Sequence, residues 1–198
     1  DGALDDKKQS KVFEKAILHN AERLSDMVSS LLDLSRIDYG ELKLNIEELP
    51  INEHINKAID SLKNLGKRKN ISITCSCSKG KIVLADKNAL ERILNNLIEN
   101  AFKYSDSQST INISTKKVKD HLEISVKDSG RGIPDEEQDF LFDRFYRTAE
   151  ARATEEKGSG LGLAIVKNLV NNLNGEVGVK NAKPQGSIFW FTLPLKTP

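Results

Sequence analysis

Apolar residues in the first part of the chain recur at helical spacing. From about Lys8 to Asp38 they follow one another at intervals of three or four, as in a helix with a coiled-coil seam, and Tyr39-Gly40 gives a stop signal. Apolar side chains in such a stripe are expected to pack against another element. We favour packing against a helix of another chain over folding back on the same domain. The stripe consists of Phe13, Ile17, Leu24, Met27, Leu31 and Leu34.

After Gly40 the pattern alternates between strand and helix periods. Alternation from Leu42 to Ile46 predicts a short strand, and Ile51 to Leu65 has helical spacing until Gly66-Lys-Arg-Lys-Asn70 interrupts it. Two apolar runs, Ile71 to Cys77 and Lys81 to Leu84, predict a strand pair around Ser78-Lys-Gly80.

Asp86 is then predicted to cap a helix whose apolar face is Leu90, Ile93, Leu94, Leu97 and Ile98. The remaining predicted elements are antiparallel strands at Ile111 to Thr115 and Leu122 to Val126, a short helix from Pro134, a helix from Gly160 to Leu173, and a hairpin of Gly175 to Lys180 with Ser187 to Leu193.

Composition narrows the class of protein. The 198 residues include 38% hydrophobic residues, and 30 Lys and Arg balance 29 Asp and Glu, so no basic excess indicates nucleic acid or an anionic membrane surface. No apolar run approaches the roughly 20 residues of a membrane helix, and the first residues lack the pattern of a signal peptide. We therefore expect a cytoplasmic, globular chain without membrane contact, and the sequence leaves open that it is the cytoplasmic part of a membrane-anchored sensor.

Cys75 and Cys77 share one face of a predicted strand with Ile71 and Ile73. They are expected to be small core residues, because a disulfide between neighbours two apart in a strand is geometrically awkward and no nearby Cys or His completes a metal site.

Three segments have residue types that suit a nucleotide. Gly158-Ser-Gly-Leu-Gly-Leu-Ala-Ile-Val-Lys167 is a glycine-rich loop that runs into an amphipathic helix, an arrangement that presents backbone amides to phosphate, although it lacks the ending of a Walker loop. Asp128-Ser-Gly-Arg-Gly-Ile133 follows a predicted strand. Asn96 and Asn100 are four residues apart on a helix, so that both amides point the same way, and one of them is suited to hold magnesium.

These segments, in this order, resemble the N, G1 and G2 boxes of sensor histidine kinases, in the GHKL superfamily. Leu141-Phe-Asp-Arg-Phe-Tyr-Arg147 is similar to the family's F box, and Phe142 and Phe145 in it are expected to be hydrophobic anchors packed in the core. Gly186-Ser-Ile-Phe189 is similar to the family's last box, and the helix from Ala21-Glu-Arg-Leu24 through Leu31 to Gly40 is similar to the second helix of its dimerisation domain. The resemblance implies an α+β fold, the GHKL (Bergerat) sandwich of a mixed, mainly antiparallel sheet covered by helices, preceded by a long helix from a dimerisation hairpin. It also implies residues 1–40 as that second helix, without the first, and residues 41–198 as a catalytic ATP-binding domain.

The resemblance further implies a role for each matching residue. Asn100 is the magnesium ligand, and Asp128 accepts the adenine amine while Gly130 and Gly132 let the backbone approach the purine. Asn96, Lys103 and Arg147 are the catalytic residues, and Lys103 and Tyr104 reach over phosphate and ribose. The other implied ATP-binding residues are Ile133, Lys157, Gly158, Ser159, Gly160, Leu161, Gly162, Leu163 and Ser187.

The family's phosphate acceptor is a histidine followed by an acidic residue, and none of the 3 histidines here has that neighbour. The resemblance also implies that ATP hydrolases of the superfamily have a glutamate, which activates water, at the position of Asn96. An amide cannot activate water, so transfer of phosphate from Mg-ATP to a histidine elsewhere is favoured over hydrolysis. The expected partners are a second copy, in a homodimer through the helical bundle, and the receiver domain of a response regulator. Two alternatives stay open: a non-catalytic module that senses ATP or binds a partner, and an ATPase.

Overall fold

The structure is a computed structural model that describes residues 43–153 and 158–196, with residues 13–14, 17–18, 21, 24–25, 27–29, 31–32 and 35 of the N-terminal part. Its contacts divide the chain into two units, Asp1–Glu41 and Leu42–Pro198. Among the described residues, no helix has both the length and the apolar character that crossing a membrane requires.

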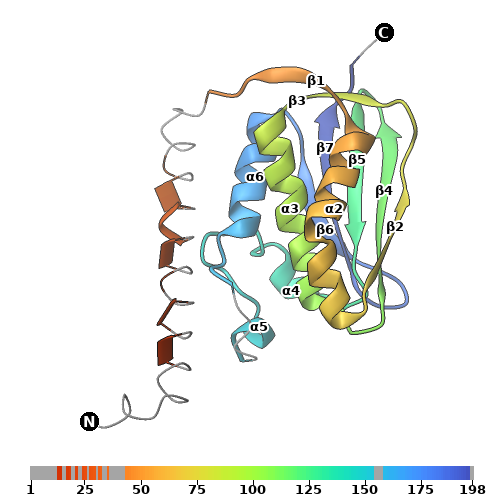
Figure 1. Ribbon diagram of the computed structural model, residues 1–198. Coiled ribbons are helices and arrows are strands. Elements are labelled where there is room, and N and C mark those ends of the chain that lie inside the picture. Colours follow the sequence, from red (N-terminus) through yellow and green to blue (C-terminus); the bar gives the residue numbers. More distant parts are fainter. Residues whose placement is uncertain are drawn as a thin grey trace. The chain divides into compact units, whose positions relative to one another are not determined.

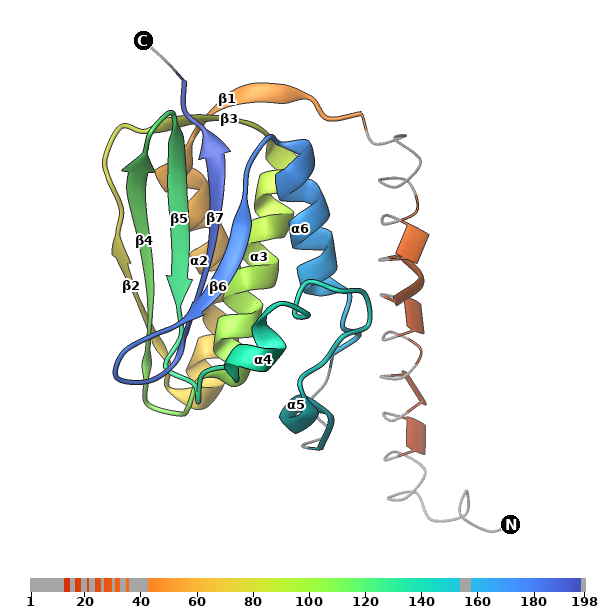
Figure 2. The same ribbon diagram turned by 180° about the vertical axis from the view of Figure 1, so that it is seen from behind.

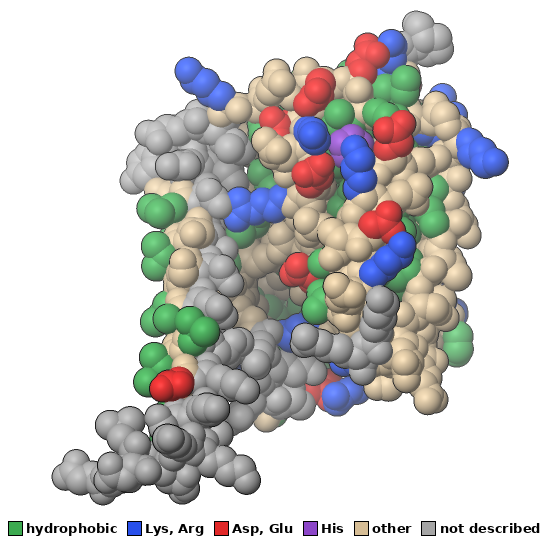
Figure 3. Space-filling model, viewed as in Figure 1, with side chains coloured by type: hydrophobic (Ala, Val, Ile, Leu, Met, Phe, Trp, Pro, Cys, Tyr) green, Lys and Arg blue, Asp and Glu red, His purple; other side chains and the backbone are tan. Residues whose placement is uncertain are grey.

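In the first unit every described residue is helical, and its described apolar side chains are exposed apart from Met27, which is half-buried (Figure 3). Phe13 is 50% exposed, Ile17 68% and Leu31 49%, so the unit leaves this face uncovered. Leu34, like His19 and the stop signal at Gly40, lies outside the described residues. Pairing of the helix with a second chain stays a prediction.

The second unit is built on a five-stranded sheet with the strand order β2-β4-β5-β7-β6 (Figures 1 and 2). Only β2 and β4 run parallel, and the other neighbours are antiparallel, which confirms the mixed, mainly antiparallel sheet. Alternation of buried and half-buried positions along β5 places Leu122, Ile124 and Val126 in the core. The strands are β2 (Ser72–Ser76), β4 (Thr110–Val118), β5 (His121–Lys127), β6 (Val177–Asn181) and β7 (Ser187–Pro194).

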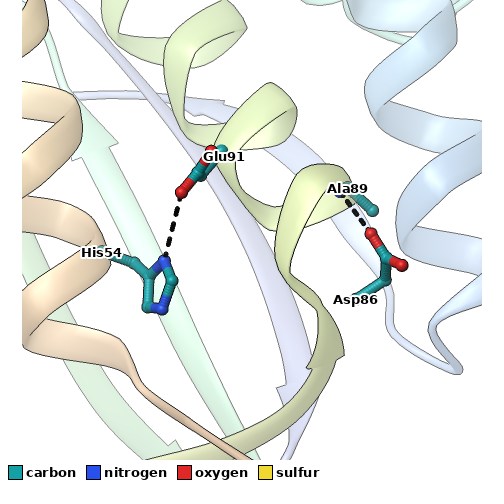
Figure 4. Close-up of polar contacts among 4 residues, drawn as sticks. All are labelled: His54, Asp86, Ala89 and Glu91. Carbon is teal, nitrogen blue, oxygen red and sulfur yellow. Dashed lines mark hydrogen bonds and ion pairs between the residues drawn. The ribbon is translucent and has the colours of Figure 1, made fainter. Parts of the chain in front are cut away.

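Helices α2 (Ile51–Lys69), α3 (Lys87–Tyr104) and α6 (Gly162–Asn172) cover one face of this sheet (Figures 1 and 2). The start of α3 is the one predicted: the Asp86 side chain accepts a hydrogen bond of 2.9 Å from the Ala89 N–H (Figure 4). The predicted apolar face of α3 is buried against the sheet and its neighbouring helices, with Leu90, Ile93, Leu94, Leu97 and Ile98 all fully buried.

A small second sheet pairs β1 (Ile46–Pro50) with β3 (Ile82–Asp86). The predicted hairpin between the runs on either side of Ser78-Lys-Gly80 is therefore wrong, because β2 pairs with β4 and β3 pairs with β1. Short apolar runs indicate a strand but do not specify its partner, and here both partners are distant in sequence.

Two other local predictions are corrected. Gly66 does not end α2 but lies buried inside it, at a point where a Cβ would approach the Phe102 ring to 2.8 Å. Cys75 and Cys77 are joined by a disulfide, with Cα atoms 5.6 Å apart, and Cys75 is exposed, so these residues are not small core residues. The edge position of β2 explains the exposure, since only β4 covers it within the sheet.

Candidate active site

The asparagine pair lies on α3, whose apolar side is used for packing. Asn96 and Asn100 are half-buried, as expected for residues one turn apart on the flank of a covered helix. The Asn96 amide is oriented by a hydrogen bond of 2.9 Å from its Nδ2 to the carbonyl of Arg92. Its Oδ1 faces α6, because a Cβ added to Gly162 would lie 2.5 Å from that atom. The first turn of α6 thus packs directly on the asparagine face of α3.

The last turn of α3 meets the beginning of the glycine loop. The Lys103 Nζ lies 4.5 Å from the centre of the Tyr104 ring and donates a hydrogen bond of 2.8 Å to the Tyr104 hydroxyl. A Cβ at Gly158 would be 3.0 Å from the same Nζ. The structure therefore brings Lys103, which is bonded to Tyr104, to the loop that was predicted to bind phosphate.

Asp128 lies just beyond the end of β5 and is only 3% exposed. Its Oδ1 accepts two backbone hydrogen bonds of 2.9 Å each, from the N–H groups of Gly130 and Ser187. Burial raises the pKa of this carboxyl above its ordinary value of 3.8, and the two backbone donors act in the opposite direction. Both backbone donors meet Oδ1, and the Ser187 side chain also bonds to this carboxyl. A carboxylate has about four acceptor sites, so Asp128 can still accept a ligand N–H.

The loop after Asp128 packs on the end of α3 with no room for a side chain at Gly130. A Cβ at Gly130 would lie 2.5 Å from the Tyr104 carbonyl oxygen, and the Ser129 N–H donates a hydrogen bond of 3.3 Å to the Ser105 hydroxyl. Gly132 has a φ of +86°, which favours glycine. The predicted adenine segment and the end of α3 are thus one packed unit.

Asn181, at the end of β6, was not predicted as part of the site. It pairs with both backbone groups of Ile133, accepting from the N–H at 2.9 Å and donating to the carbonyl at 2.8 Å. The sequence shows Asn181 only as the start of a turn, and nothing in its spacing indicates which backbone it contacts. It supports the far end of the loop that begins at Asp128.

The glycine loop also contacts the F motif. Gly160 has a φ of +75°, and a Cβ there would lie 2.7 Å from the Phe145 carbonyl carbon. Phe145 itself has a φ of 61° and is 60% exposed, so the expectation that it anchors the core is wrong, whereas Phe142 is buried as expected. The hydrogen bond of 3.0 Å from the Phe145 N–H to the Gly160 carbonyl holds this backbone and turns the ring outward.

The other predicted site residues lie along the same segments. Ser159 accepts a hydrogen bond of 3.2 Å from the Leu161 N–H, Leu161 is fully buried, and Leu163 is half-buried in the first turn of α6.

The guanidinium of Arg147 donates to the Ala151 carbonyl in α5 (Ala149–Ala153). This helix follows the short helix α4 (Asp135–Gln138). Lys157 lies outside the described residues. The structure therefore gathers the α3 residues, the loop from Asp128 to Ile133 and the glycine loop, and leaves Arg147 bonded to α5.

The chain is similar to proteins of one known family. A profile described as histidine kinase-, DNA gyrase B- and HSP90-like ATPase matches residues 85–197. The sensor-like histidine kinase SenX3 of Mycolicibacterium smegmatis is 33% identical over 192 residues, which are 97% of this chain and 50% of that protein. The chain thus spans about half the length of the curated relatives it matches.

Solved structures of histidine kinases have the same fold. Full-length ShkA in complex with AMPPNP superimposes with a TM-score of 0.82 at 26% identity, over 95% of this chain and 39% of that one. Histidine kinase ThkA in complex with response regulator protein TrrA superimposes with a TM-score of 0.78 at 25% identity, over 98% of this chain and 54% of that one.

Proposed function

The chain belongs to the histidine kinase-, DNA gyrase B- and HSP90-like ATPase family, and we propose that it is the ATP-binding catalytic part of a sensor histidine kinase. In this proposal it transfers the γ-phosphate of Mg-ATP to an acceptor histidine other than the 3 in this sequence. A response regulator aspartate then receives the phosphoryl group. These reactions take place in the cytoplasm, where ATP is available.

The observation that carries the proposal is the contact between α3 and the glycine loop. Asn96 meets Gly162, and Lys103 meets Gly158, so the amide and ammonium groups lie beside a chain segment that is suited to phosphate. The Asp128 loop packs on the same end of α3, through Gly130 and Tyr104. One nucleotide can therefore meet an adenine acceptor and a phosphate cradle together.

Adenine specificity follows from the chemistry of Asp128. A carboxylate oxygen accepts a hydrogen bond from the exocyclic amine of adenine, whereas guanine presents a carbonyl at the same position and is repelled. The two backbone donors on Oδ1 keep the carboxyl in one orientation. We therefore propose that the site selects ATP over GTP.

Asn100 would hold magnesium through its amide oxygen, which is the hard oxygen type of ligand that this ion prefers. The fit rests on its half-buried position, one turn beyond Asn96, on the flank of α3. When bound, the ion would supply positive charge that neutralises the phosphates and favours transfer of the terminal phosphoryl group. Lys103 and the amides near Gly158 would contribute further positive charge to the phosphates.

Asn96 favours transfer over hydrolysis. Its amide cannot take a proton from water, and its Nδ2 already donates to the Arg92 carbonyl. With an amide instead of a carboxylate at position 96, water is a poor competitor of a histidine imidazole that is brought to the site. Homodimerisation through the exposed stripe of Phe13, Ile17 and Leu31 would supply that histidine in the parent protein.

Calorimetric titration of the 198-residue chain with ATP, ADP and GTP, with and without magnesium, tests the nucleotide site. Magnesium-dependent binding of ATP that is lost in Asp128→Asn and kept in Asp120→Asn, a matched change at an exposed turn, is the expected result. Absence of ATP binding by the folded wild-type chain would overturn the proposal.

Phosphoryl transfer is tested separately with γ-labelled ATP and the parent protein. Acid-labile, base-stable label on a histidine, without sustained release of phosphate, is expected. Sustained release without protein label would identify an ATPase instead.

A further inference from the structure

The end of α3 is held by one lysine from a different helix. Lys69, the last residue of α2, donates hydrogen bonds from Nζ to the carbonyls of Phe102 at 3.1 Å, Lys103 at 2.7 Å and Ser105 at 3.2 Å. An ammonium has three N–H donors and no acceptor, so the three carbonyls use all of its donors. The last carbonyls of a helix have no partner within the helix and carry partial negative charge, and Lys69 supplies both the donors and the charge.

Lys69 is itself held firmly in place. Its carbonyl accepts a hydrogen bond of 3.0 Å from the Gln108 N–H, and Gly66, one turn earlier in α2, packs against the Phe102 ring with no space for a Cβ. The carbonyl of Gly66 accepts a hydrogen bond of 3.0 Å from the Ile71 N–H. The close approach of α2 to the last turn of α3 thus places the ammonium where the three carbonyls converge.

The segment that Lys69 holds includes two of the predicted nucleotide ligands and supports a third part of the site. Lys103 and Tyr104 lie inside it, and the loop from Asp128 rests on it through Gly130 against the Tyr104 carbonyl. The Ser129 N–H also reaches the Ser105 hydroxyl at 3.3 Å. A shift at residues 102–105 would therefore move the phosphate side and the adenine side of the site together.

We propose that Lys69 is a positioning residue for the nucleotide, acting by holding residues 102–105 rather than by touching ATP. This inference rests on the proposed function for its effect on binding, but the local clamp exists without nucleotide. Loss of the ammonium leaves three carbonyls of the helix end without their donors. Residues 102–105 then fray, and the Asp128 loop loses the surface on which it lies.

The test compares Lys69→Met with Lys63→Met in the 198-residue chain. Methionine keeps most of the apolar stem and removes the donors, and Lys63 lies on the same helix with a side chain that is 62% exposed and paired with Asp60. For Lys69→Met we expect the Kd of Mg-ATP to rise about tenfold. We also expect amide hydrogen exchange to accelerate at residues 102–106 and 128–132, with other core amides unchanged. Lys63→Met should match the wild type in both measurements.

A conservative variant separates positioning from general stabilisation. Lys69→Arg retains the charge but offers a planar fork of donors, so it should restore part of the affinity and part of the exchange protection. Wild-type affinity and exchange in Lys69→Met would overturn the proposal, and so would faster exchange spread evenly over the whole domain. If the wild type binds no ATP, the proposed function fails, and local exchange at residues 102–106 and 128–132 still decides whether Lys69 holds this segment.

Discussion

Asn96 of α3 occupies the space into which a side chain at Gly162 of α6 would project, since a Cβ there would lie 2.5 Å from the Asn96 Oδ1. Real Cβ atoms do not approach so closely, so Gly162→Ala must displace the amide or the start of α6. The clashing atom is the end of the Asn96 side chain, which can move, so we expect the free energy of unfolding to fall by about 1 kcal/mol or less, at the low end for overpacked sites. Urea unfolding gives the stability, and calorimetry should show weaker ATP binding.

The steric origin of this effect is checked with Asn96→Ala as a second change. Combined with Gly162→Ala, it makes room for the new methyl group and should recover part of the lost stability, relative to the sum of the single variants. Strictly additive losses would show that the contact between Asn96 and Gly162 is not the cause.

Asp128→Asn should separate binding from stability. The pKa of Asp128 is raised by burial, so the folded state favours the protonated carboxyl, and stability is lost as the pH rises from 3.8 through the raised folded value. Asparagine keeps an oxygen for the N–H groups of Gly130 and Ser187 and carries no charge. At neutral pH we therefore expect unfolding at an equal or higher urea concentration, together with loss of adenine binding.

The pH dependence provides the control for this variant. The stability of Asp128→Asn relative to the wild type should increase as the pH rises through the titration of the carboxyl and then level off. A variant that is less stable than the wild type at neutral pH, and relatively more stable in acid, would contradict this sign.

His54 should make the domain sensitive to mild acid. It is 4% exposed between α2 and α3, with Nδ1 3.8 Å from Glu91 Oε1, too far for a hydrogen bond (Figure 4). Burial, followed by the charge of Lys57, lowers the pKa of His54 below 6.5, so the folded state favours the neutral ring. Stability is therefore complete above pH 6.5 and falls as the pH decreases through the folded value.

Urea unfolding over this range of pH measures the effect. His54→Gln should flatten the dependence on pH, and His121→Gln, at the half-buried start of β5, should retain it. An unchanged slope in His54→Gln would assign the acid sensitivity to other groups.

Asn181→Ala should weaken nucleotide binding more than it weakens the fold. It removes both hydrogen bonds to the backbone of Ile133, at an exposed position where water can replace them. We expect a loss of stability of about 0.5–1.5 kcal/mol and a rise of several-fold in the Kd of ATP. Asn172→Ala is the matched control, because Asn172 is exposed and the hydrogen bond that its side chain makes within the described part of the chain goes to Asn168 of the same helix. Equal affinities in the two variants would remove Asn181 from the site.

The sequence predicted the elements that have a strong local signal. The period and cap of α3, the hairpin of β6 and β7, and the three motifs are all properties of neighbouring residues, and each appears where it was expected. The disulfide of Cys75 and Cys77 and the outward turn of Phe145 were missed, because they depend on contacts that a strand or helix period does not encode.

The residues that hold the candidate site in place could not be predicted from the spacing of residues along the sequence. Lys69 and Asn181 act on backbone groups far away in the sequence, through contacts that any lysine or asparagine can make if it is placed correctly. Asn96, Asn100 and Asp128 could be predicted as site residues because their spacing along the sequence is informative, whereas the residues that support them follow no such spacing. The close approach of Gly66 in α2 to Phe102 in α3 depends on how the two helices pack, so it cannot be predicted from either segment alone.

The two oxygens of the Asp86 carboxylate accept hydrogen bonds from two different segments of the chain. Oδ1 caps α3 through Ala89, and Oδ2 accepts a hydrogen bond of 2.9 Å from the Asn45 N–H, in the segment that leads into β1. In mechanical terms, Asp86 is a shared anchor: tension that enters the domain along residues 43–45 is applied to the first turn of the helix that carries Asn96 and Asn100. A force on the segment that leads into β1 would therefore act, through Asp86, on the N-terminus of α3, while the five-stranded sheet holds the rest of α3 in place.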